Sequence, residues 1–347
     1  MTSKWMASAF VAVTAAFALA APAFADTQEL DVRAWQNGLG TTAETEIDVF
    51  ATETGAATAK VTVYAPQGYT ATLNQAAGTP IGLAESFFSE AGTLKELDGK
   101  VVADDPARFA ADPTAQACAP GAHAAAWTLS LGAGVDAQQV HLFVDPATGN
   151  DATFASYVIQ GCFASPDVPA SAGGAPAAAK FLALRVDLPR VFSNPSGRGS
   201  YTWRALVMPY VAGTSTQSPG GAVELHSIVA LPQTLTLVAK YDAKRHRVTV
   251  GGRLTSAGAG RAGTRVHLYS GTNPKGNLIA FAVVKTKKDG SFSVTRSISK
   301  TTYFGAQVLF SVQSCTGATI GPASCVQESL APPPLAFAKA VVPKKLK

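Results

Sequence analysis

Segments in which apolar and polar residues alternate recur along most of the chain. In Ser291-Phe292-Ser293-Val294-Thr295 every second residue is apolar, as expected for a strand with one buried and one exposed face. Alternating or continuously apolar segments cover residues 30–35, 47–51, 60–65, 69–74, 100–103, 126–131, 140–144, 154–159, 181–188, 201–208 and 222–229, and then 234–240, 247–251, 265–269, 279–286, 291–296 and 307–313. This pattern predicts an all-β protein with two antiparallel β-sandwich modules.

Turn-forming residues separate these segments. Pro-Gln-Gly at 66–68, Asn-Pro-Ser-Gly at 194–197 and Lys-Asp-Gly at 288–290 all suit chain reversal between strands. Residues 86–96 could form a short helix instead of a strand, because the apolar residues there approximate one helical face. Residues 164–179 are rich in Ala, Pro, Gly and Ser and are typical of a surface loop or a linker. Residues 26–231 could thus form one sandwich or two, and we favour one.

The first twenty-five residues have the features of a signal peptide. Lys4 precedes a long apolar run, and Ala23-Phe24-Ala25 offers small residues where a signal peptidase cleaves. We expect cleavage before Asp26 and a secreted protein without a transmembrane segment, in the extracellular space or associated with the cell wall. At the other end, the Pro- and Lys-rich residues 331–347 are expected to be a disordered tail.

Residues 232–330 are expected to form the second module, and three of their segments resemble a known group. The segments are Gly-Gly-Arg-Leu-Thr at 251–255, Ala-Gly-Thr-Arg-Val-His-Leu-Tyr at 262–269 and Thr-Lys-Lys-Asp-Gly-Ser-Phe-Ser-Val at 286–294. This order is similar to that in bacterial Ig-like and carboxypeptidase-regulatory-like β-sandwich modules. The resemblance implies a spacer or adhesion unit and names no ligand. The whole arrangement also resembles secreted proteins of actinobacterial type.

Four cysteines follow the predicted signal peptide: Cys118, Cys162, Cys315 and Cys325. An even number in an exported protein suggests two disulfides, for which three pairings are possible. We favour Cys118 with Cys162 and Cys315 with Cys325, because each bond then closes within one module. A zinc or redox site is the competing interpretation, but the sequence has no Cys-x-x-Cys.

Composition changes the picture mainly through charge. The chain is 47% hydrophobic and 15% charged, which excludes disorder throughout. Residues 26–230 carry a net charge of −10, whereas residues 231–347 carry +14.

A basic module attracts polyanions, so anionic wall polymers and exopolysaccharide are candidate partners. The candidate residues are Lys240, Lys244, Arg245, Arg247, Arg253, Arg261, Arg265, Lys285, Lys287 and Lys288. The alternatives are a solvated basic face and a contact with the protein's own acidic module. No motif for dedicated nucleic-acid binding accompanies the lysines.

Catalytic signatures are missing from the sequence. It contains no Gly-x-Ser-x-Gly, no His-Glu-x-x-His and no phosphate-binding Gly-x-x-x-x-Gly-Lys-Ser/Thr. We therefore expect a non-catalytic binding or structural protein without a cofactor or metal. The competing hypothesis is a polysaccharide hydrolase with its carboxylates in residues 26–231, where His123, His141 and His226 also lie.

Two weaker binding hypotheses concern the first module. Asp145, Asn150 and Asp151 could offer oxygen ligands to calcium, although a turn between strands explains the same residues. Tyr201 and Trp203 share one face of a predicted strand and could stack on sugar rings. We favour a place in the core for this pair.

Overall fold

The fold is described from a computed structural model, which covers residues 28–35, 38–134, 137–175, 178–273, 278–308, 326–329 and 335–341. The predicted signal peptide, Cys315 and Cys325 lie outside these ranges. The first body contains β1 (Glu29–Ala34), β2 (Thr42–Phe50), β3 (Thr58–Pro66), β4 (Thr70–Ala71), β5 (Pro80–Glu90), β6 (Thr93–Asp104), β7 (Ala125–Leu131), β8 (Gln138–Pro146), β9 (Ala155–Cys162), β10 (Lys180–Ser193), β11 (Gly199–Pro209), β12 (Val223–Leu231) and β21 (Val326–Ser329).

These strands form one sheet in the order β1-β2-β10-β5-β6-β7-β8-β9-β3-β11-β12-β21, with β4 paired to β10. The sheet curls until β1 lies beside β12, where the Val32 N–H donates to Ser227 Oγ at 2.9 Å. Pairing is antiparallel throughout except between β12 and β21. The prediction of an all-β, antiparallel fold is confirmed.

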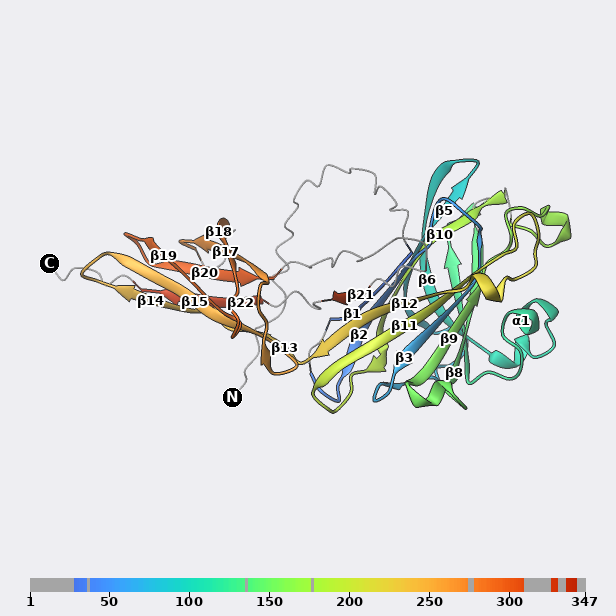
Figure 1. The fold of residues 1–347 in the computed structure, drawn as a ribbon, viewed down its shortest axis with the longest axis horizontal. Coiled ribbons are helices and arrows are strands. Elements are labelled where there is room, and N and C mark those ends of the chain that lie inside the picture. Colours follow the sequence, from blue (N-terminus) through green and yellow to red (C-terminus); the bar gives the residue numbers. More distant parts are fainter. Residues whose placement is uncertain are drawn as a thin grey trace.

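The two walls of the curled sheet face each other across one apolar core (Figure 1). Side chains of β2 and β10 meet those of β3, β8 and β9 around a residual cavity of about 30 Å³. Trp203 on β11 is fully buried, and the rings of Tyr69 and Phe192 meet it edge-on at 5.0 and 5.5 Å. Trp127 on β7 is also fully buried. Trp203 therefore belongs to the core, as we favoured, and neither of these two indoles is available to stack on sugars.

Residues 86–96, for which a short helix is the alternative to a strand, are part of a β-hairpin. Strands β5 and β6 pair up to Glu90 and Thr93, and the two residues between them, Ala91 and Gly92, have φ of 48° and 80°. Two consecutive residues with positive φ are characteristic of the type I′ turn, which joins two strands through a two-residue loop and matches their right-handed twist. The apolar residues of this segment alternate between the two faces of the sheet, and this overrides the weak helical periodicity.

The loop after β9 does not separate two sheets. After it, β10 runs between β2 and β5, and β11 pairs with both β3 and β12. Strands before and after residues 164–179 thus share one sheet.

The second body is a β-sandwich. One sheet holds β13 (Gln233–Leu235), β14 (Val238–Asp242), β15 (Arg247–Ser256), β16 (Ala259–Gly260) and β19 (Ser291–Ser297), and the other holds β17 (Arg265–Gly271), β18 (Ile279–Lys285), β20 (Thr302–Gln307) and β22 (Leu335–Ala340). Val250 and Leu254 of the first sheet are fully buried, as are Val266, Leu268 and Phe304 of the second. These inward residues alternate with exposed polar ones, which is why the strands were visible in the sequence.

The chain after residue 325 departs from the expected disordered tail. Leu335–Ala340 form β22, which pairs with β20, and Val326–Ser329 form β21 in the first sheet. The prediction of disorder from residue 331 is therefore wrong for residues 335–340. A partner strand supplies the backbone hydrogen bonds that a Pro- and Lys-rich composition does not reveal. No helix within the described ranges is long and apolar enough to cross a membrane.

Candidate functional site

Three of the ten candidate basic residues share one exposed sheet face. Lys240 on β14 and Arg247 and Arg253 on β15 all point outward, because the intervening residues Val248 and Val250 point into the core. We call these three residues the basic strip. The Arg253 Nε donates to the carbonyl of Asp289 at 2.8 Å, which holds this guanidinium against the sheet.

Hydroxyl groups lie within the basic strip and on the neighbouring strand. Thr249 lies between Arg247 and Arg253 on β15, opposite Lys240 on one side and Thr295 of β19 on the other. The two threonine hydroxyls lie 3.1 Å apart. This face therefore offers cationic groups and hydroxyl donors together, the combination that binds phosphate, sulfate and carboxylate groups.

Two further cations extend the strip at the turn from β14 to β15. Lys244 and Arg245 are exposed there, and the carboxylate of Asp242 accepts hydrogen bonds from both of their backbone N–H groups. Arg245 also lies 3.6 Å from Asp242 as an ion pair. The turn thus presents two cations at the end of the second body.

The remaining candidates lie elsewhere. Arg265 and Lys285 are directly opposite each other on β17 and β18, in the other sheet of the sandwich. Arg261, Lys287 and Lys288 lie next to the turns at the far ends of the strands. Five of the ten residues lie along β14, β15 and the turn between them. Arg265 and Lys285 lie on the opposite side of the sandwich, because its two sheets face away from each other, whereas Arg261, Lys287 and Lys288 lie beside the Arg253 end of β15. Alternation alone could assign a face within each strand, but not which strands share a sheet.

Carboxylates gather on the outer face of the first body. Ligand atoms of Glu85, Glu96 and Asp98, on β5 and β6, all lie within 4.8 Å of one another. Asp187 lies on the neighbouring β10 and also points outward. We call these four residues the acidic patch. Arg185 contacts its edge, with Nη1 2.7 Å from Glu85 Oε2.

The same face buries charge on β1 and β2. Asp48 is 1% exposed and accepts a hydrogen bond from Arg185 Nε at 2.8 Å, while Arg33 contacts Asp31 and Glu46. Burial raises the pKa of Asp48, although the two guanidinium groups oppose this shift. Removing either arginine would leave the buried carboxylates with only one guanidinium to compensate their charge, and this is expected to be destabilising.

The carboxylates clustered around Asp187 also predict how the free energy of unfolding depends on pH. Burial, together with Glu44 and Glu46, raises the pKa of Asp187 from 3.8 to about 6. The folded state then binds a proton more tightly than the unfolded state, so this group's contribution to the free energy of unfolding falls as pH rises from about 4 to about 7. We expect Asp187→Asn to lose this decline and to be more stable than the wild type at about pH 8 but not at about pH 4. Urea unfolding at both pH values measures this, and an unchanged pH dependence in the variant would contradict the assignment.

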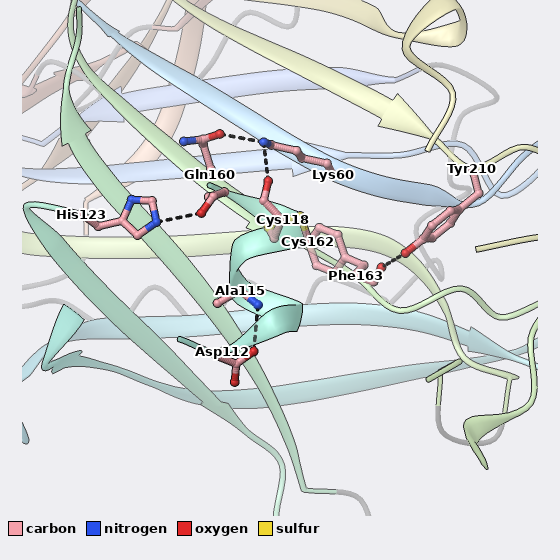
Figure 2. Close-up of a disulfide and its surroundings, with 10 residues drawn as sticks. Lys60, Asp112, Ala115, Cys118, His123, Gln160, Cys162, Phe163 and Tyr210 are labelled. Carbon is pink, nitrogen blue, oxygen red and sulfur yellow. Dashed lines mark hydrogen bonds between the residues drawn. A yellow bond between two sulfur atoms is a disulfide. The ribbon is translucent and has the colours of Figure 1, made fainter. Parts of the chain in front are cut away.

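A short excursion between β6 and β7 is fastened to the sheet by the predicted disulfide. The helix α1 (Pro113–Cys118) begins at the cap Asp112, whose carboxylate accepts hydrogen bonds from the next turn, and ends at Cys118. Cys118 is bonded to Cys162 at the end of β9. Figure 2 shows Lys60 beside this bond, where its Nζ donates to the Cys118 carbonyl and to Gln160 Oε1, each at 2.7 Å. This half of the predicted disulfide pairing is confirmed.

His123 fastens the return of the excursion. Its Nδ1 lies 2.7 Å from Asp145 Oδ2 and its Nε2 lies 3.0 Å from the Ala119 carbonyl. The other oxygen of Asp145 accepts from the Ala124 N–H. Both oxygens of Asp145, one of the three residues of the calcium hypothesis, are therefore engaged by protein groups. His141 contacts the Thr128 hydroxyl at 3.1 Å and His226 contacts Glu224 at 2.8 Å, so the three histidines do not converge on one site.

One apolar cavity of about 210 Å³ opens beside the disulfide. Its walls include Phe88, Phe181 and Phe163, and the last two rings stack at 3.8 Å. Gln138 and Gln139 supply the polar side chains of the lining. Its chemistry suits an apolar group, and sequence reasoning missed it because its lining residues come from β5, β8, β9 and β10.

Comparisons with known proteins give no family for this chain. No family model and no curated protein matches the sequence. Among solved structures, domains D2 and D3 of the major pilin SpaD from Corynebacterium diphtheriae match at 11% identity and a TM-score of 0.27, over 87% of this chain and 97% of that one. The full-length pilin matches at 12% identity and 0.27, over 90% of this chain and 67% of that one. Such TM-scores do not establish a shared fold, and the resemblance to Ig-like and carboxypeptidase-regulatory-like modules stays a prediction.

Proposed function

We propose that this is an exported, non-catalytic binding protein whose second body attaches to extracellular polyanions through the basic strip. The observation that carries the proposal is the outward display of Lys240, Arg247 and Arg253 on one sheet face. Export rests on the predicted signal peptide in residues 1–25. Anionic wall polymer or exopolysaccharide is the proposed ligand class.

The dimensions of the strip suit an extended ligand. Arg247 and Arg253 lie six residues apart on one strand, which spans about 20 Å. Lys240 lies one strand away, opposite the midpoint region at Thr249. Cations spaced along a flat face can contact successive anionic groups of a polymer, and each contact releases counterions from it. A small anion would use only one of them.

If the basic strip binds polyanions, removal of its charges should weaken binding more than removal of the same number of charges from the other sheet. We expect Arg247→Gln with Arg253→Gln to elute from a heparin column at clearly lower salt than the wild-type chain, with a shallower dependence of affinity on salt. The matched control is Arg265→Gln with Lys285→Gln, which removes the same charge from the other sheet. The control should elute close to the wild type. Equal shifts in the two variants would show that net charge alone retains the protein and would overturn the assigned strip.

A further inference from the structure

The two bodies carry surfaces of opposite charge. The acidic patch lies on β5, β6 and β10 of the first body, whereas Lys244, Arg245 and Arg247 lie at the β14–β15 turn of the second. We call the latter three residues the basic tip. Figure 1 shows the β14–β15 turn at the end of the second body that points away from the first body, which contains β5 and β6.

The basic tip lies at the end of the second body that is remote from the first body and its acidic patch (Figure 1). β12 ends at Leu231 and β13 begins at Gln233, so a single residue, Pro232, connects the bodies at this point. β13 pairs with β15 at Ser256. Arg247 lies nine residues before Ser256 on that strand, which places the tip about 30 Å from the connection. Return of the chain to the first sheet at β21 constrains the second body further.

Exposed apolar side chains lie among the residues of the acidic patch and on the outward face of β14. Leu83 and Leu94 on β5 and β6 are 60% and 40% exposed and point outward with the acidic patch. Val238 on β14 is 53% exposed and lies on the outward face opposite Gly251, four residues along β15 from Arg247 of the basic tip. Apolar residues surrounded by charge are typical of protein contacts, because burial of the apolar group adds affinity while the charges set orientation.

We propose that the basic tip of one copy docks on the acidic patch of a second copy. The contact joins two different surfaces, so each copy keeps one free surface of either kind and association continues head to tail. The partner is a second copy because the chain itself supplies both charges, net −10 in residues 26–230 and net +14 in residues 231–347. This inference stands apart from polyanion binding, although a polyanion would compete for Arg247.

Charge reversal at each surface tests the contact in the full chain. Sedimentation velocity over a dilution series should show association of the wild type at about 20 mM salt and its loss at about 500 mM, because added salt screens exposed charges. Lys244→Glu with Arg245→Glu should abolish association, and so should Glu96→Lys with Asp98→Lys. A mixture of these two variants should associate again, since the basic tip of the second variant meets the unchanged acidic patch of the first.

The control reverses charges outside both surfaces. Arg265→Glu with Lys285→Glu changes the net charge as much as the basic-tip variant does, and it should still associate. A wild type that remains monomeric at low salt, or a variant mixture that remains monomeric, overturns the inference. Heparin retention of the wild type separates the two proposals: retention without wild-type association refutes the contact between copies and leaves polyanion binding intact.

Discussion

Replacing Trp203 by alanine is expected to lower the free energy of unfolding by about 3–5 kcal/mol. The indole is fully buried on β11, between the rings of Tyr69 and Phe192. Truncation removes the transfer free energy of the side chain and leaves a void that a curled, hydrogen-bonded sheet closes only in part. Urea unfolding followed by circular dichroism measures the loss.

Leu83→Ala is the control for this experiment. Leu83 is 60% exposed, so its truncation should change the free energy of unfolding by no more than about 0.5 kcal/mol. Comparable losses in the two variants would mean that Trp203 is not in the core and that the two walls of the sheet do not meet as described.

Removing the Cys118–Cys162 disulfide is expected to cost about 4 kcal/mol on the chain-entropy model. The bond closes a loop between residues 44 apart and joins the α1 excursion to β9. Cys118→Ala with Cys162→Ala should therefore unfold at markedly lower urea. Cys315→Ala with Cys325→Ala provides a second variant with the same number of substitutions, and unfolding of both variants is measured in the same series. If the first double variant unfolds at the wild-type midpoint, the disulfide does not constrain the unfolded chain as described.

Strand identity was predictable because alternation is a local property. Phe292 and Val294 point into the sandwich and Ser293 and Thr295 point out, as their spacing predicts. The pairing Cys118–Cys162 was also inferred correctly, from the positions of the cysteines within one module. Neither inference needed knowledge of which strands are neighbours.

Features that depend on distant pairing were missed. Asp48 has the sequence pattern of an outward residue, and it does lie on the outer face, yet it is 1% exposed because Arg185, 137 residues away, covers it. The acidic patch and the division of the basic residues between two sheets depend on the same long-range register. Sequence alone gives no order of strands, so it could supply the charges of the candidate site but not their grouping.

The path of the chain after β20 has a practical consequence for any dissection of this protein. It returns to the first sheet as β21 and then to the second body as β22, where Leu335–Ala340 cover the edge of β20. A recombinant fragment that stops at residue 330 would expose that edge, and exposed strand edges promote aggregation. A fragment meant to reproduce the second body must therefore extend through Val341. Even that fragment would lack the first sheet, with which β21 pairs.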